Sequence, residues 1–176
     1  MPITSFTAFS DGLEPQQRSR AHFVADTDLD DDRLWVPWGE TEGVWFQPCC
    51  FNVTAGGFSI VVKALPGAVL GAHYHVGDVY GFTMRGHWGY LEHDFLATPG
   101  TFIYEPAGEA HTLFVAKDSP GPMMTFFVVG GGLLFLDKPV DGTFESYEDG
   151  FTFLEMARKH YHDMGLDAAQ LDERIR

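Results

Sequence analysis

Three histidines have the residue type and the spacing of a transition-metal site. His73 and His75 are separated by one residue in a β-type stretch, and alternate residues of a strand project from the same face. His111 begins another β-type run after the turn at 105–109. Neutral imidazole is a favoured ligand of iron, zinc, nickel and copper. We therefore expect His73, His75 and His111 to hold one metal ion.

A metal ion bound by three neutral imidazoles keeps its full dipositive charge. An octahedral ion would also keep three coordination sites open on one face, which suits an anionic bidentate substrate together with O2. This chemistry favours Fe(II). Zinc with three histidines and a water molecule is the competing interpretation, and Zn or Ni at the same ligands would give hydrolase, isomerase or lyase chemistry.

The elements that must position these histidines are short β-type runs. Gly, Pro and Asp clusters punctuate the chain from Cys49 to Leu136, and regular short strands with such turn signals indicate a sandwich or a barrel. Pro and Gly interrupt the segments Trp35–Gly39 and Val44–Pro48, which predicts edge-strand pieces there. The other runs include Phe58–Leu65, Val79–Met84, Gly89–His93, Thr101–Tyr104, His111–Ala116 and Thr125–Val129.

The two ends of the chain differ from this middle part. The first residues show weak periodicity and are expected to form an arm packed across the body. Apolar residues recur at helical spacing from Phe153 onward, and Gly165 is a plausible helix stop. We predict a single domain over residues 1–176, made of an N-terminal arm (1–34), a barrel (35–140) and C-terminal helices (150–176).

The charge and the cysteines exclude several classes of partner. The formal net charge of −14 argues against nucleic-acid binding and against an anionic membrane surface. We expect no transmembrane helix, since no run of about 18 apolar residues occurs, and we see no signal peptide. The adjacent Cys49 and Cys50 could pair only with strain, so free thiols and a cytoplasmic location fit best.

The residues around the histidines resemble the two sequence motifs of the cupin superfamily. The motifs are Gly-x5-His-x-His-x3-Glu-x6-Gly and Gly-x5-Pro-x-Gly-x2-His-x3-Asn. The resemblance implies an all-β fold, the double-stranded β-helix or jelly-roll barrel, with the metal inside its mouth. The matching residues are Gly67, His73, His75 and Gly86 for the first motif, and Gly100, Pro106, Gly108 and His111 for the second.

The chain departs from the two motifs at two positions. Val79 stands where the first motif has its glutamate, so the usual carboxylate ligand is missing. Val115 stands where the second motif has its asparagine. Asp78 is one residue away from the glutamate position, and a shift of one residue on a strand turns a side chain to the other face.

A narrower resemblance covers most of residues 35–135. The stretches 73–81, 86–92 and 104–113 look like cupins of the 2,4′-dihydroxyacetophenone dioxygenase group. Acetylacetone-cleaving dioxygenases and the metal-binding domain of the ChrR anti-sigma factor are similar at lower resolution. The resemblance implies a non-heme Fe(II) dioxygenase that uses O2 to cleave a small aromatic ketone, an aryl α-hydroxyketone, to an aryl carboxylate and formate. The alternatives are a β-diketone dioxygenase and a non-catalytic cupin sensor of the ChrR type.

Further residues are candidates for roles beside the metal. Glu92 is in phase with Trp88 and Tyr90, and we expect it to be a base, a distant fourth ligand, an orienter of a histidine or a surface carboxylate. Tyr80 and Tyr104 are candidates for hydrogen bonds to substrate oxygens, although they also fit as ordinary barrel aromatics.

The remaining titratable residues near the motifs are given structural roles. Glu105 and Glu109 flank the turn before His111 and are expected to face solvent. The other histidines, at positions 22, 87, 160 and 162, lie outside the motif spacing. Since twofold assemblies are the commonest soluble oligomers, we expect a homodimer, or a homotetramer built from dimers.

Overall fold

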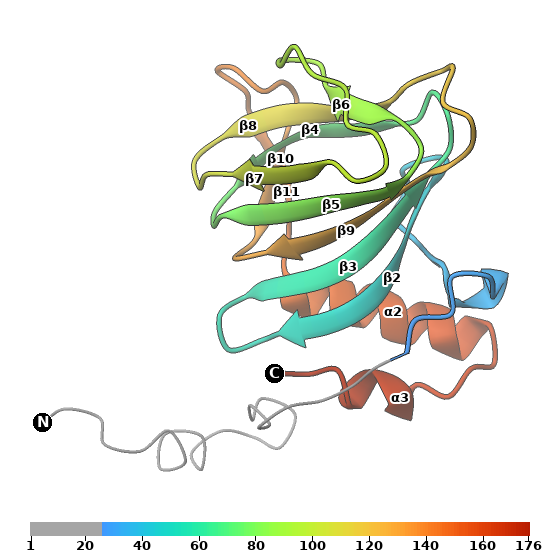
Figure 1. Cartoon of the computed structure of the whole chain (residues 1–176). Helices are drawn as coiled ribbons and strands as arrows, with labels where there is room; N and C mark the ends of the chain where they lie inside the picture. The colour runs from blue at the N-terminus through green and yellow to red at the C-terminus, as the bar shows by residue number, and fades with distance from the viewer. Residues whose placement is uncertain (1–25) are drawn as a thin grey trace, which may run out of the picture.

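The computed structural model describes residues 26–176, so most of the predicted N-terminal arm lies outside the described residues. Strands dominate the described part of the chain, and helices follow them at its C-terminal end (Figure 1). The elements are a 3-10 helix η2 (Asp32–Leu34), β1 (Val36–Pro37), β2 (Val44–Asn52), β3 (Gly57–Ala64), β4 (Val69–His75), β5 (Val79–Arg85), β6 (Trp88–Tyr90), β7 (Phe102–Glu105), β8 (Ala110–Val115), β9 (Met123–Val129), β10 (Leu133–Leu136), β11 (Phe144–Glu148), α2 (Gly150–Asp163) and α3 (Ala169–Asp172).

The strands form two antiparallel sheets that face each other. The six-stranded sheet has the order β1-β2-β3-β9-β5-β7, and the five-stranded sheet has the order β11-β10-β4-β8-β6. Neighbours in each sheet are mostly distant in sequence, which is the pattern of a jelly roll. The expected all-β barrel with a short C-terminal helical segment is therefore confirmed.

Alternation along the strands places the core between the sheets. In β5, Val79 and Thr83 are buried, whereas Tyr80 and Phe82 between them are exposed. Successive side chains of a strand point to opposite faces, so one sequence supplies both a core face and an outer face. The core contains many Phe and Val residues, among them Phe46, Phe51, Phe58, Phe127, Val62 and Val129.

Two parts of the sheets differ from the sequence-based prediction. The segment beginning at Val44 is a nine-residue strand, longer than the predicted piece, and it is an edge of the described sheet beyond Phe46, where β1 no longer pairs with it. Pro48 lies on this unpaired stretch, where the missing backbone N–H costs no hydrogen bond to a second neighbouring strand. Strands β10 and β11 were not predicted, although β10 pairs directly with the histidine-bearing strand β4.

Helix α2 packs beneath β2 and β3, as Figure 1 shows. It begins at a capping box in which the Asp149 carboxylate accepts from the backbone N–H of Thr152, and the Thr152 hydroxyl pairs with the Asp149 backbone. Phe153, Ala157 and Tyr161 recur every four residues and are buried. The expected stop at Gly165 is confirmed, since Gly165 has φ +67°. Within residues 26–176, no helix is long and apolar enough to cross a membrane.

Candidate metal centre

The three predicted histidines converge between the two sheets. His73 and His75 lie two residues apart on β4, and His73 is paired directly with His111 on the neighbouring strand β8. Directly opposed residues of antiparallel strands share a face, so all three imidazoles point inward. One ligand atom of each histidine lies within 4.8 Å of the corresponding atoms of the other two. The predicted His73, His75 and His111 cluster is thus present in the fold.

Glycine turns set the positions of the strands that carry these histidines. Gly108 has φ +92°, in the left-handed region that favours glycine, and its backbone N–H donates to the carbonyl of His75 at 2.9 Å. The backbone N–H of His75 in turn donates to the carbonyl of Glu109 at 3.0 Å. The turn of the second motif is therefore tied to the end of the first motif by two backbone hydrogen bonds.

Burial keeps the three imidazoles neutral. It lowers the pKa of His75 to about 3, with a smaller contribution from His73. It also lowers the pKa of His111 to about 2, with contributions from His73, His75 and His93. The pKa of His73 is lowered by burial as well, and the carbonyl of Gly71 partly opposes this. Neutral imidazole is the form that binds a metal ion.

The hydrogen bonds around the cluster fit a cation at its centre. Nδ1 of His73 lies 2.8 Å from the carbonyl oxygen of Gly71, so Nδ1 carries the proton and Nε2 keeps its lone pair. The Nε2 atoms of His75 and His111 face each other at 3.0 Å. Because both rings are neutral, at most one of these two nitrogens can donate to the other. A metal ion would bind both lone pairs, so the donor set fits one.

Glu105 belongs to the same cluster, and the expectation that it faces solvent was wrong. Glu105 is 2% exposed, and its Oε2 atom lies 3.2 Å from Nε2 of His75 and 3.6 Å from Nε2 of His111. Strand β7 extends one residue beyond the predicted Tyr104, and alternation then turns Tyr104 outward and Glu105 inward. The prediction from sequence assigns Glu105 to the turn, and for that reason it does not place the carboxylate in the core.

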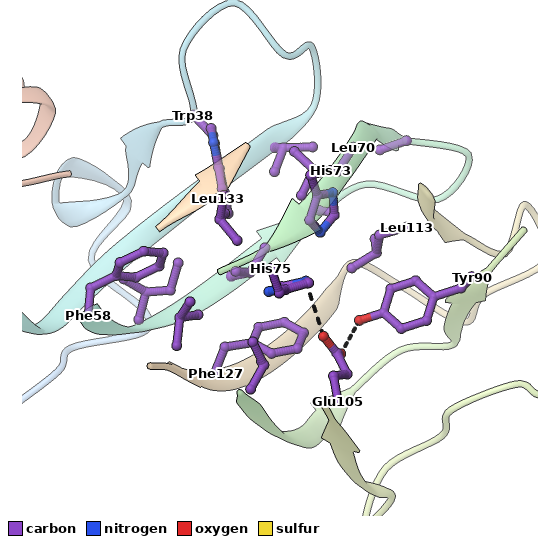
Figure 2. Close-up of a pocket in the computed structure, with 17 residues that line it drawn as sticks. Trp38, Phe58, Leu70, His73, His75, Tyr90, Glu105, Leu113, Phe127 and Leu133 are labelled. Atoms are coloured by element: carbon purple, nitrogen blue, oxygen red, sulfur yellow. Dashed lines mark hydrogen bonds and ion pairs between the residues drawn. The ribbon is translucent and has the colours of Figure 1, made fainter. Parts of the chain in front are cut away.

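Burial raises the pKa of the Glu105 carboxyl to about 7, a hydrogen bond from Tyr90 lowers it, and the charge of Glu109 raises it. The Tyr90 hydroxyl donates to Oε1 of Glu105, as the dashed line in Figure 2 shows. The Tyr90 ring also stacks on His111, with ring centroids 3.6 Å apart and 13° between the planes. Tyr90 therefore contacts both a histidine and the carboxylate, a role that sequence reasoning did not assign.

The cluster lies at the polar end of an otherwise apolar cavity (Figure 2). The empty space is about 520 Å³, including the part that is open to solvent. His73, His75, Tyr90 and Glu105 line one part of it. The apolar lining residues include Trp38, Phe58, Leu70, Leu113, Phe127 and Leu133. A cavity of this kind suits a ligand with an apolar body and a polar end.

The structure does not bring Tyr80 or Tyr104 to the histidines. These tyrosines are paired with each other across β5 and β7, on the outer face of the sheet, and they are 42% and 55% exposed. Neither lines the cavity, and the Tyr80 hydroxyl donates to Asp78 at 2.9 Å. Their inward neighbours are Val79 and Glu105, because side chains alternate along both strands.

Glu92 is also outside the cavity, although it contacts the strand of His111. Strand β6 ends at Tyr90, so the alternation that put Glu92 in phase with Tyr90 does not continue to it. The exposed Glu92 accepts a hydrogen bond at 2.7 Å from the backbone N–H of Thr112, the residue after His111. The neighbouring His93 lies 2.5 Å from Oε1 of Glu109. His93, Glu109 and His111 form a second, more exposed group of potential ligands.

The other histidines have separate surroundings. His160 and His162 lie on α2, where Nε2 of His160 is 2.8 Å from the carbonyl oxygen of Arg33 and Nδ1 of His162 is 3.3 Å from Asp163. His87 precedes β6, and its backbone N–H donates to Ser119. His22 lies outside the described residues.

Comparisons with known proteins agree with this fold. The chain matches a family model described as "ChrR Cupin-like domain" over residues 22–133. It is similar to the solved structure of an RmlC-like cupin protein from Ralstonia eutropha, at 28% identity and a TM-score of 0.70, over 75% of this chain and 83% of that chain. A second Ralstonia eutropha protein, of unknown function with a cupin-like fold, shows 25% identity and a TM-score of 0.66, over 70% and 76%.

An acetylacetone dioxygenase from Acinetobacter johnsonii has a TM-score of 0.67 at 16% identity, over 81% of this chain and 97% of that chain. At this identity the likeness shows a shared fold. No curated protein matches the chain.

Proposed function

This chain belongs to the ChrR cupin-like family of the cupin superfamily, and on that premise we propose that it is an Fe(II)-dependent dioxygenase. Its substrate in this proposal is an aryl α-hydroxyketone of the 2,4′-dihydroxyacetophenone type. The observation that carries the proposal is the convergence of three buried neutral imidazoles at one end of an apolar cavity. The sequence resemblance over residues 35–135 supports the choice of substrate class.

The proposed reaction joins one molecule of the hydroxyketone with one molecule of O2. The bond between the carbonyl carbon and the hydroxymethyl carbon breaks, and the products are an aryl carboxylic acid and formic acid. All four oxygen atoms of the products come from the two reactants, so no further oxidant is needed. Fe(II) held by the imidazoles would supply Lewis acidity toward the substrate oxygens and the redox chemistry that O2 requires.

The chain's own residues would bind and orient the substrate. The aromatic ring of the substrate would lie against the apolar wall, which includes Phe58, Leu113 and Phe127. Its ketone and hydroxyl oxygens would then face His73 and His75 at the polar end of the cavity. The apolar wall would also exclude water from the reacting carbons.

Three other functions are alternatives at the same site. A β-diketone dioxygenase would use the same imidazoles with a different chelating substrate. A metal-binding sensor without turnover is the second alternative, and the ChrR domain named in the description of the family model supports it. Zn or Ni at the three histidines would give hydrolytic, isomerising or lyase chemistry.

Metal analysis combined with oxygen uptake tests these functions. The purified protein is loaded anaerobically with Fe(II), Zn or Ni, and O2 consumption is followed with an aryl α-hydroxyketone, with a β-diketone and without substrate. We expect uptake only with Fe(II) and the hydroxyketone, with equal amounts of arylcarboxylate and formate. Uptake with the diketone alone would move the assignment to the second substrate class. Metal binding without uptake on either substrate would contradict the oxygenase.

The variant His111→Ala is expected to lose both metal retention and oxygen uptake, since it removes one of three converging ligands. His162→Ala is the matched control, because His162 is a solvent-exposed histidine of α2. Full uptake by His111→Ala would remove His111 from the site.

A homodimer, or a homotetramer built from dimers, is also proposed. Strand β7 is the last strand of its sheet among the described strands, so its outer edge can pair with a second copy. Exposed aromatic side chains cover the outer face beside that edge, on Tyr80 and Phe82 of β5 and on Phe102 and Tyr104 of β7. Light scattering should give a dimer or tetramer mass, and a monomer mass would contradict the proposal.

A further inference from the structure

The pairing of β5 with β7 places a carboxylate opposite Val79, the position where this chain lacks the glutamate of the first cupin motif. Val79 stands at the motif's glutamate position on β5, and its direct partner on β7 is Glu105. Directly opposed residues of an antiparallel pair lie on the same face of the sheet. Both residues are buried and line the cavity. The carboxylate that is missing from β5 is therefore present on the adjacent strand.

The oxygen of Glu105 has the spacing of a metal ligand. Two ligands at right angles, each about 2.1 Å from an ion, lie about 3.0 Å apart. Nε2 of His75 and Nε2 of His111 are 3.0 Å apart, and Oε2 of Glu105 is 3.2 Å and 3.6 Å from them. The distances between these three atoms are thus close to the spacing of ligands that share one ion.

The two carboxylate oxygens of Glu105 differ in whether they accept a hydrogen bond. Oε1 accepts from the Tyr90 hydroxyl, whereas Oε2, which faces the imidazoles, is buried without a hydrogen-bond partner. A buried acceptor without a partner costs free energy of about 1–3 kcal/mol. A cation at the cluster would remove this cost. Tyr90 would then act as the partner that orients a ligating carboxylate.

We propose that Glu105 is the fourth protein ligand of the metal ion. It would take the place of the glutamate that the first cupin motif has at the position of Val79. This inference deepens the proposed function, on which it rests, because it changes the chemistry of the same centre. The carboxylate lowers the net charge of a dipositive ion to +1. It also leaves two open positions on an octahedral ion instead of three. A bidentate substrate would fill both of them, so O2 would have to enter by displacing a ligand or react with the bound substrate.

The test compares metal binding in Glu105→Gln and in Glu148→Gln. Glutamine keeps the size of Glu105 and an oxygen for Tyr90, but it removes the negative charge that a metal ligand supplies. Glu148 is the matched control, since it is a partly buried carboxyl that also accepts a hydrogen bond from an aromatic side chain, that of Trp38, and it belongs to neither group of potential ligands among the described residues. Affinity is measured by competition for Zn and for Co(II), and the visible spectrum of the Co(II) protein reports the ligands directly.

We expect Glu105→Gln to weaken Co(II) binding about 100-fold or more, beyond the usual effect of losing an outer partner, and to change the Co(II) spectrum. Glu148→Gln should leave both unchanged. Wild-type affinity and spectrum in Glu105→Gln would overturn the proposal. Weaker binding with an unchanged spectrum would also overturn it, since Glu105 would then position a histidine without touching the ion.

A double variant moves the carboxylate back across the same register pair. Val79→Glu combined with Glu105→Val should recover Co(II) affinity to within about tenfold of wild type. If this variant does not fold, as judged by circular dichroism, the spectrum of Glu105→Gln decides alone.

The variant His111→Ala separates this inference from the function. If His111→Ala binds Co(II) as wild type does, the metal centre itself is wrong. If His111→Ala loses the metal while Glu105→Gln keeps wild-type affinity and spectrum, only the role of Glu105 is wrong.

Discussion

Removing one hydroxyl group from Tyr90 tests how the metal centre is supported. The Tyr90 hydroxyl donates to Oε1 of Glu105, and the ring stacks on His111 at a centroid distance of 3.6 Å. Tyr90→Phe keeps the stacked ring, so His111 retains its packing. The substitution leaves Oε1 of a buried carboxylate without that donor.

The magnitude follows from this one contact. A hydrogen bond to a charged group contributes about 1.5–3 kcal/mol, and each ~1.4 kcal/mol changes an affinity about tenfold. The metal affinity of Tyr90→Phe should therefore fall by about 10–150-fold if Glu105 ligates the ion. We expect the lower end of this range, because a bound cation itself stabilises the carboxylate that has lost its donor.

The assay is competition for Zn against a chromophoric chelator at pH 7, for wild type and for Tyr90→Phe. Tyr161→Phe is the matched control, because Tyr161 is a buried tyrosine on α2 that does not line the cavity. Thermal unfolding of both metal-free variants checks that neither has lost its fold. Equal Zn affinity in Tyr90→Phe and wild type would refute the reasoning, since the hydrogen bond would then contribute nothing to the ligand set.

Two further predictions concern Glu148 and Glu92. Burial raises the pKa of Glu148 to about 7, although the Trp38 indole N–H donates to it at 2.7 Å and lowers the pKa. The folded protein therefore holds a proton on Glu148 that the unfolded chain releases above its ordinary pKa of 4.5, so stability falls as pH rises from about 4.5 to 7. Urea unfolding should show this loss to be about 3 kcal/mol smaller in Glu148→Gln, and parallel pH profiles would contradict the assignment. Glu92, which accepts from the backbone N–H of Thr112, is proposed to position His111. Glu92→Ala should weaken Zn binding roughly tenfold, and Glu92→Gln should bind Zn as wild type does because it keeps an acceptor oxygen. Wild-type binding in Glu92→Ala would show that Glu92 has no role at the site.

The cluster of three histidines could be predicted because its signal is local. His73 and His75 share a face through the two-residue period of a strand, and the turn residues around His111 fix where the next ligand begins. Gly108 shows why the turn residues are informative: its φ of +92° is a conformation that other residues adopt only with strain. The C-terminal helix was likewise readable from the spacing of Phe153 and its neighbours.

The assignment of Glu105, and of Tyr104 beside it, depended on where one strand ends. With β7 ending at Tyr104, Glu105 belongs to a turn and is expected in solvent. With β7 ending at Glu105, the same alternation places Glu105 inside and Tyr104 outside. Strand ends are the least certain feature of a prediction from sequence, and an error of one residue decides whether the terminal residue follows the alternation or is assigned to a turn.

The sequence by itself determined a succession of short strands and two histidines on one strand face, because periodicity and turn residues act over a few neighbouring positions. The resemblance to the cupin motifs added the two-sheet barrel, the third histidine and the absence of a glutamate at Val79. Only the tertiary structure decided that Glu105 lies opposite Val79 and that Tyr90 contacts both Glu105 and His111. The physical reason is that these contacts join β5, β6, β7 and β8, and the pairing of strands from distant parts of the chain is fixed by packing of the whole core rather than by any local pattern.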